Sequence, residues 1–251
     1  MTKLRRLLSN WPRGTLRLTK ELERNGIGRQ LLASYKESGW VESFDHGVYK
    51  LSGDSPDWTG AVYALQRLDE LTIHPGGKTA LALKGYSHYI GMGNETRFLY
   101  MHHLDGNYRW LSKFETVERV QTNVFNYHKT EYFSRYSTGT FDIYVSVPEL
   151  AVLEMLYLTP NKQSFDEAGK IIELLYSLRP ELLQRLLQEC RSVKVVRLLL
   201  FFADYYDHPW LKELDQSKLN LGSGNRVIVQ DGIFSPKYQI TVPRDYGYDT
   251  V

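Results

Sequence analysis

The amino-acid sequence predicts an α+β fold: an N-terminal winged helix-turn-helix, followed by a larger α+β domain with a mostly antiparallel sheet and a C-terminal helical region. Three pattern changes along the 251 residues support this prediction. Helical and hairpin patterns occupy residues 16–51, β-branched and aromatic residues dominate 95–147, and helical patterns dominate 148–206. The length allows two ordinary domains, which we place at residues 1–54 and 58–251.

The helices of the first domain are marked by apolar spacing and by helix-ending residues. Leucines and a tryptophan between residues 4 and 11 have amphipathic spacing, and residues 15–18 have the character of a short strand. Thr19 can cap a helix that ends at Asn25-Gly26, since glycine adopts the positive φ that terminates helices. A third helix is expected over residues 28–38.

A hairpin follows these helices. Strand-like runs 40–44 and 48–51 flank Asp45-His46-Gly47, and a short connection that ends in glycine is a hairpin signal. Helix, turn, helix and hairpin is the order of a winged helix-turn-helix, a DNA-binding module. The predicted core of this domain consists of apolar side chains: Leu4, Leu7, Leu8, Trp11, Leu18, Leu22, Ile27, Leu31, Leu32, Tyr35, Trp40, Val48 and Leu51.

The wheel of the third helix separates an apolar side from a polar one. The polar side carries Arg29, Gln30, Ala33, Lys36 and Glu37. Arginine suits guanine and glutamine suits adenine in the major groove, and a small residue allows close approach to the groove floor. An ordinary solvated helix face is the alternative, but the hairpin that follows favours recognition of DNA.

The basic residues are concentrated at the N-terminal end. Residues 1–40 hold nine lysines and arginines against three acids, a net charge of +6, so the rest of the chain carries −4 of the total of +2. Such a segment attracts phosphates, although a basic surface can also serve solubility. We expect Arg13 and Arg17 to contact phosphates, and His46 at the hairpin tip, with Lys50 nearby, to touch the backbone or minor groove.

The second domain begins after a polar junction, residues 51–57, which is rich in turn-forming residues. Helices are expected at 58–68 and 77–86, then strands at 96–102, 108–113, 116–120, 123–127 and 140–145. Further helices open at Val147-Pro148, Ser164, Pro180 and Ser192, and the chain returns to strand at 226–229 and 238–242.

Composition restricts the class of protein. A single cysteine, Cys190, excludes an intramolecular disulfide and fits a reducing cytosol. The basic start lacks the apolar core of a signal peptide, and no run reaches the roughly 18 apolar residues of a membrane span. We therefore expect a cytoplasmic protein with no membrane partner.

Motifs for catalysis or cofactor binding are incomplete. Gly77-Lys78-Thr79 resembles the end of a phosphate-binding loop, but Thr72 stands where that loop needs glycine. Gly222-Ser223-Gly224 lacks the following carboxylates that metal-ion catalysis needs, and it fits a turn. His102 and His103 are neighbours on an expected strand and point to opposite faces. Arg191 could lower the thiol pKa of Cys190, but packing among helices fits that cysteine better. The sequence therefore predicts that the protein is not an enzyme. It also predicts that the chain has no catalytic residues and binds no metal ion or cofactor.

Four stretches of the chain carry a resemblance: Ser38–Leu51, His74–Tyr89, Val147–Leu156 and Leu221–Pro243. In this order they resemble the AbiEi family of antitoxins. The resemblance implies a winged helix-turn-helix that represses the antitoxin–toxin operon of a type IV system, and a C-terminal domain that neutralises the toxin AbiEii, a nucleotidyltransferase-like protein. The antitoxin of such a pair need not form a stable complex with its toxin. On the implied recognition helix lie Arg29, Gln30, Ser34 and Lys36, whose contacts are inferred from the wheel.

A second hypothesis is a winged-helix transcriptional regulator whose C-terminal domain binds a small effector. A ligand retained in stoichiometric amount on purification would favour it. A neighbouring nucleotidyltransferase-like reading frame that is toxic when expressed alone would favour the antitoxin. The operator sequence and the oligomeric state on DNA do not follow from the sequence.

Overall fold

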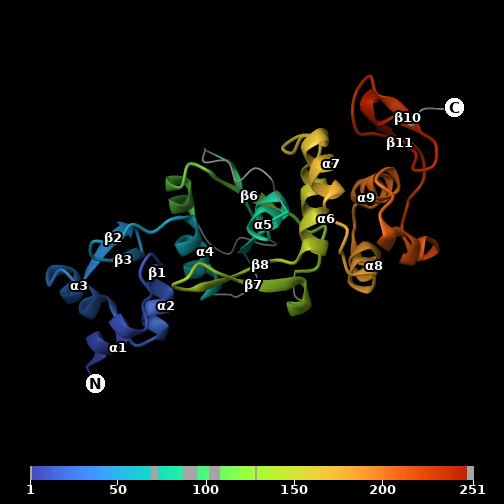
Figure 1. Ribbon diagram of the computed structural model, residues 1–251. Coiled ribbons are helices and arrows are strands. Elements are labelled where there is room, and N and C mark those ends of the chain that lie inside the picture. The colour runs from blue at the N-terminus through green and yellow to red at the C-terminus, as the bar shows by residue number, and fades with distance from the viewer. Residues whose placement is uncertain (1, 69–72, 87–94, 102–107, 128, 248–251) are drawn as a thin grey trace. The chain divides into compact units, whose positions relative to one another are not determined.

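The computed structural model describes residues 2–68, 73–86, 95–101, 108–127 and 129–247. The chain forms two compact units, each made of several segments. The first unit comprises Met1–Pro75, Asn94–Gln121 and Phe133–Val145, and the second comprises Gly76–Gly93, Thr122–Tyr132 and Ser146–Val251. Helices and short strands are mixed throughout, so the fold is α+β (Figure 1). Within the described ranges, no helix is both long and apolar enough to span a bilayer.

The N-terminal part of the first unit contains the predicted elements in the predicted order. These are α1 (Lys3–Ser9), β1 (Leu16–Leu18), α2 (Thr19–Arg24), α3 (Arg29–Glu37), β2 (Val41–Asp45) and β3 (Val48–Leu51). The strands form an antiparallel sheet in the order β1-β3-β2, with Leu16 opposite Lys50 and Val41 opposite Leu51. The element order is therefore confirmed, and its assignment as a winged helix stays a prediction.

The core under this sheet contains the predicted residues, except that Val41 is buried where Trp40 was expected. Leu22, Ile27, Leu32 and Tyr35 are buried together, and Leu4, Leu7 and Leu8 of α1 pack against them. Trp40, predicted to be in the core, is 48 % exposed, and Val41 is buried in its place. The strand begins at Val41, so alternation along β2 directs Val41 to the core and leaves the preceding tryptophan outside.

Strand β1 is covered on both faces, because helix α4 (Trp58–Gln66) packs against it. All three residues of β1 are buried. A Cβ atom added to Gly60 would clash with the carbonyl oxygen of Gly14, so only glycine permits this close approach of helix to backbone. Whether residues 1–54 fold alone stays a prediction, but α4 belongs to the packing of this region.

The rest of the first unit has its strands only partly where they were predicted. Strands β4 (Ile73–Pro75), β5 (Arg97–Met101) and β6 (Val117–Gln121) form one sheet, with β4–β5 antiparallel and β5–β6 parallel. Strands β7 (Phe133–Ser137) and β8 (Asp142–Ser146) form a separate pair. The predicted strands near 96–102, 116–120 and 140–145 are confirmed over their described residues, whereas β4 and β7 were not predicted. His102 and His103 lie outside the described residues.

The predicted strand at 108–113 is wrong, since Arg109–Lys113 is a 3-10 helix. Trp110 and Leu111 are consecutive and both buried, which suits one helical turn on a core and not an alternating strand.

The second unit is mainly helical. Its helices are α5 (Gly77–Leu83), α6 (Pro148–Leu158), α7 (Phe165–Glu173), α8 (Pro180–Glu189) and α9 (Val193–Tyr205). Helix α6 contacts the other four and is buried from Glu149 to Leu156, as expected for a central helix. The helix starts predicted at Ser164 and Ser192 are confirmed, because both hydroxyls accept from backbone N–H groups three residues on.

The C-terminal strands form a small sheet of their own. Strand β11 (Ile240–Val242) pairs antiparallel with β10 (Ile233–Ser235) and parallel with β9 (Arg226–Val227). The strand predicted at 123–127 is wrong, because Val124 pairs instead with the loop after α8, where Arg191 N donates to its carbonyl at 3.1 Å.

Candidate nucleic-acid interface

Helix α3 presents a polar face because its apolar residues are anchored below it. Leu32 and Tyr35 are buried in the core of the first unit. The helix starts after Gly28 and leaves four predicted contact residues exposed on its other side: Arg29, Gln30, Ser34 and Lys36. Gln30 and Ser34 are four residues apart and are therefore neighbours, and Ala33 lies between Arg29 and Lys36, so the four side chains are spread over the exposed half of the helix. Their side chains offer the donors and acceptors that base edges and phosphates need.

The Arg29 side chain remains mostly exposed to solvent although it forms an ion pair. Its Nε lies 3.3 Å from Glu23 Oε1, and the two side chains are 86 % and 42 % exposed. Such surface pairs contribute little to stability, so a phosphate or base can compete for this guanidinium. The Lys36 ammonium lies 6.0 Å from the centre of the Tyr49 ring, at the edge of cation–π distance.

The tip of the β2–β3 hairpin is a tight turn beside the start of α2. Gly47 has φ +72°, and its carbonyl accepts from Thr19 N at 2.9 Å. The Asp45 carboxylate accepts from His46 N at 2.6 Å, which fixes the turn. His46 itself is exposed. The predicted tip residue is therefore accessible, and the N-terminus of α2 lies next to it.

The opposite side of the hairpin is held by Lys113, a residue that the sequence did not implicate. Lys113 Nζ lies 2.8 Å from Asp45 Oδ2 and donates to Phe44 O at 2.7 Å. The Phe44 ring stacks on Phe114 with centroids 5.6 Å apart. Hydrogen bonding from Lys113, and then from His46 N, lowers the pKa of the Asp45 carboxyl. The tip is thus a braced structure, and removing it would disturb packing as well as any contact with DNA.

Arg13 and Lys50 meet at Asp54 rather than at the hairpin tip. Arg13 Nη1 lies 2.7 Å from Asp54 Oδ1, and Lys50 Nζ donates to Asp54 O at 2.8 Å. Lys50 also pairs with Glu42 at 3.0 Å. Arg13 is 68 % exposed and accessible, whereas Lys50 is 22 % exposed and lies near the far end of β3 from His46. The predicted proximity of Lys50 to the tip is wrong because β3 extends away from the turn.

Arg17 lies in the interior, which conflicts with its predicted phosphate contact. Its guanidinium pairs with Glu21 and donates to the Asn10 carbonyl, and both side chains of the pair are 4 % exposed. The rings of Trp11 and Tyr63 lie within 6 Å of it. Burial lowers the pKa of Arg17, and the Glu21 carboxylate opposes this shift. Because α4 covers its face of β1, Arg17 has no surface to offer a phosphate.

Other exposed cations lie on the same part of the chain. Lys20 follows Thr19 at the start of α2, beside the hairpin tip, and α1 carries Lys3, Arg5 and Arg6. The sequence indicated these cations only through the net charge of residues 1–40, and a charge count does not show where the side chains lie on the surface. Lys113 had no signal, because the segment that carries it is distant in sequence.

The motifs weighed as chemical sites have structural roles here. At the start of α5 the Gly77 N–H donates to the buried Glu154 carboxylate at 3.0 Å, so a protein carboxylate fills the place where a phosphate loop would hold its anion. Gly222 and Gly224 lie in a turn with positive φ. Burial raises the pKa of the Cys190 thiol to about 11, so the thiol stays protonated at neutral pH and is unreactive. Within the described ranges, no three or more His, Cys, Asp or Glu residues group to hold a metal ion.

Comparison with known proteins adds two kinds of similarity. Residues 1–92 match the family model described as "Transcriptional regulator, AbiEi antitoxin N-terminal domain". Residues 97–243 match the model described as "Transcriptional regulator, AbiEi antitoxin, Type IV TA system". A search of curated proteins gives no match.

A crystal structure of the RV2827C protein from Mycobacterium tuberculosis is similar in fold. It is 13 % identical in sequence, with a TM-score of 0.60 over 90 % of this chain and 85 % of that one. At this identity the likeness concerns the fold alone. The two family models match nearly the whole chain, including the N-terminal elements and the C-terminal sheet described above. The chain therefore belongs to the AbiEi family of antitoxins and transcriptional regulators of type IV toxin–antitoxin systems.

Proposed function

We propose that this protein is a cytoplasmic DNA-binding antitoxin that represses its own operon through a winged helix in residues 1–54. The observation that carries the DNA-binding part is the exposed polar half of α3, which holds Arg29, Gln30, Ser34 and Lys36 and lies opposite the buried Leu32 and Tyr35. Further groups that can contact phosphates are His46 at the adjacent hairpin tip, Lys20 at the start of α2, and Arg13, all of which are exposed. Arg17 is left out of this surface, and Lys50 is assigned to bracing Asp54.

We further propose that residues 58–251 neutralise a nucleotidyltransferase-like toxin of the AbiEii kind. Family membership supports this role, and a stable complex with the toxin is not required by it. No residue in this part is assigned to neutralisation.

Changing Arg29 or Gln30 to alanine should weaken binding to the promoter upstream of its own gene by about 1–3 kcal/mol and relax preference at one base pair, because each side chain is proposed to read a base edge. Lys20→Ala should weaken binding to all DNA sequences alike, because it is proposed to contact a phosphate. It should also reduce the slope of log affinity against log salt concentration by about one. Fluorescence anisotropy with duplexes altered at each position, at several salt concentrations, measures both effects.

The matched control is Arg119→Ala, an exposed arginine in β6 outside the proposed surface, which should bind like the parent protein. His46→Ala tests the hairpin tip without removing the Asp45–Lys113 brace. Affinity that is flat with salt, or an Arg29 variant that behaves like the Arg119 variant, contradicts the proposed interface.

The Arg29→Ala variant should still protect cells from the toxin, because protection is proposed to belong to residues 58–251. A growth assay measures this, with the toxin induced from a separate plasmid and promoter so that repression cannot pass for neutralisation. Loss of protection by the folded Arg29 variant would place neutralisation on the DNA-binding surface. Failure of the parent protein to protect would favour a regulator that responds to a small effector.

A further inference from the structure

Strand β2 contains a bulge next to the hairpin tip. The pairing advances by one residue along β3 while β2 advances from Ser43 to Asp45, so Phe44 is an extra residue with no partner on β3. Bulges of this kind bend a strand and re-aim a side chain. The Phe44 side chain is therefore available for packing outside the hairpin.

The bulged Phe44 packs against a short 3-10 helix, Arg109–Lys113, which belongs to a later segment of the same unit. Its ring stacks on Phe114 with centroids 5.6 Å apart and meets the buried Trp110 edge-on at 6.3 Å. The Lys113 ammonium lies 5.1 Å from the centre of the Phe44 ring and donates to Phe44 O at 2.7 Å. Because Trp110 is anchored in the core, these contacts fix the end of β2.

Both neighbours of the exposed His46 are held in place. Lys113 Nζ lies 2.8 Å from Asp45 Oδ2, and the other oxygen of that carboxylate accepts from His46 N at 2.6 Å. On the other side, the Gly47 carbonyl accepts from Thr19 N at 2.9 Å and from Thr19 Oγ1 at 3.1 Å. The tip is therefore tied to the 3-10 helix on one side and to the start of α2 on the other.

This arrangement suits positioning better than it suits stability. The Lys113 and Asp45 side chains are 49 % and 31 % exposed, and such exposed ion pairs contribute little to the stability of a fold. Loop tips are otherwise the places where mobility concentrates. A loop that is already held in its bound conformation loses less conformational freedom when it binds, so its affinity is higher.

We propose that Lys113 is a positioning residue for DNA binding, which acts through Asp45 and the bulged Phe44 to hold His46 where the hairpin tip meets DNA. The proposal rests on the proposed DNA binding by residues 1–54. It makes that binding depend on a residue 69 positions further along the chain than Phe44.

The test measures binding of the full chain to duplex promoter DNA by fluorescence anisotropy at several salt concentrations. Lys113→Met removes the ammonium and keeps an apolar side chain beside Phe44. Adding Asp45→Asn restores the net charge, and the amide oxygen can still accept from His46 N. Both variants should bind about three- to tenfold more weakly than the parent protein, as expected for coupling between residues in contact, with the salt dependence of the parent. Lys113→Arg keeps the charge and the donors and should bind like the parent.

The His46→Ala background shows whether Lys113 acts through the tip. In that background Lys113→Met should cause no further loss, because the group that it positions is already missing. An equal loss in both backgrounds, with a salt slope reduced by about one, would mean a direct phosphate contact by Lys113 and would overturn the proposal. Parent-like binding by the charge-matched double variant, or no rescue by Lys113→Arg, would also overturn it. A lower melting temperature of Lys113→Met without a change in DNA affinity would leave only a structural role.

The control variant is Arg119→Met, which removes an exposed cation of β6 and should bind like the parent. The proposal and the proposed function fail in different ways. A parent protein that binds no promoter DNA refutes the proposed function. Hydrogen exchange decides the brace in either case, because the amides of residues 44–47 should exchange faster in Lys113→Met than in the parent, and equal exchange overturns the brace.

Discussion

Replacing Glu21 with alanine is expected to lower the free energy of unfolding by about 3–5 kcal/mol, the usual loss when one partner of a buried ion pair is removed. Arg17 and Glu21 are each 4 % exposed, so the remaining guanidinium would have no water to replace the carboxylate. Arg67 would lose its ion pair as well. The loss is expected to reach both β1 and α4, because these two elements supply the arginines.

Denaturant unfolding of the full chain measures this loss, and two variants make the result specific. Glu23→Ala, on the exposed side of the same helix, should change stability by less than about 0.5 kcal/mol. The double variant Arg17→Met with Glu21→Leu should recover most of the loss, since apolar residues of similar volume often replace a buried ion pair without cost. A Glu21→Ala protein as stable as the Glu23→Ala protein would show that the buried pair does not stabilise this region.

Replacing Arg197 with alanine is expected to release the C-terminal sheet, at a cost of about 3 kcal/mol or more. The buried guanidinium donates to the carbonyls of Leu221 and Gly224, each at 2.7 Å, and to that of Gln239 at 3.1 Å. Each of these hydrogen bonds comes from a charged donor, and such a bond contributes about 1.5–3 kcal/mol. Hydrogen exchange should therefore rise in β9–β11, while α6 keeps its protection.

Arg197→Lys distinguishes charge from geometry, because a lysine keeps the charge but cannot present the planar fork that reaches three carbonyls. We expect intermediate exchange for this variant. Arg226→Ala, an exposed arginine on β9, is the control and should leave the sheet closed. Unchanged exchange in β9–β11 of the alanine variant would mean that other contacts hold the sheet.

The elements that the sequence predicted well are those with local signals. The helix caps at Ser164 and Ser192 and the turn at Gly47 depend on a few neighbouring residues, and the structure has them as expected. The polar face of α3 was predicted for the same reason, because its residues share one helix. What that face binds is still a prediction.

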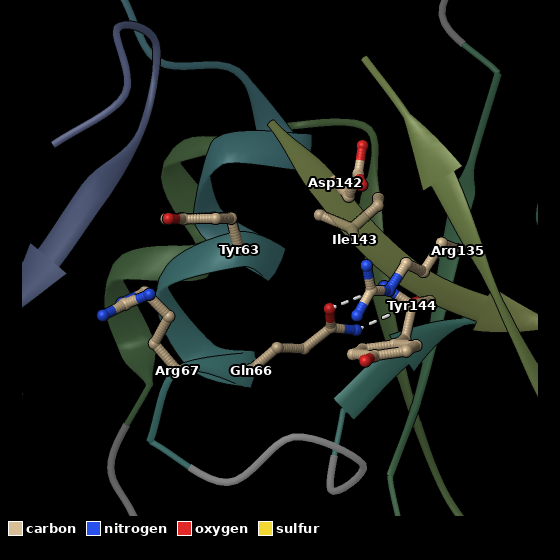
Figure 2. A pocket seen from close by; sticks show the side chains of 7 residues that line it. All are labelled: Tyr63, Gln66, Arg67, Arg135, Asp142, Ile143 and Tyr144. Carbon is tan, nitrogen blue, oxygen red and sulfur yellow. Dashed lines mark hydrogen bonds between the residues drawn. The ribbon is translucent and has the colours of Figure 1, made fainter. Parts of the chain in front are cut away.

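The predictions that were wrong depended on partners distant in sequence. Arg17 was predicted to contact phosphate because it belongs to the basic N-terminal segment, but α4 covers that side of β1. Lys113 looked like part of a strand, yet it sits in a 3-10 helix that braces the hairpin tip. The pocket beside α4 (Figure 2) draws on α4 and β7–β8, which are more than 60 residues apart along the chain, and no local pattern brings them together.

The interleaving of the two units has a consequence for synthesis on the ribosome. The first unit takes its last segment from Phe133–Val145, while Gly76–Gly93 and Thr122–Tyr132 belong to the second unit. More than half of the chain must therefore emerge before the first unit is complete, and α4 waits for β8, to which Gln66 is hydrogen-bonded. Pairing across such sequence separations is slow compared with local helix formation. A nascent chain stalled before residue 133 would expose α4 without the β7–β8 pair, and such a chain is a substrate for chaperones.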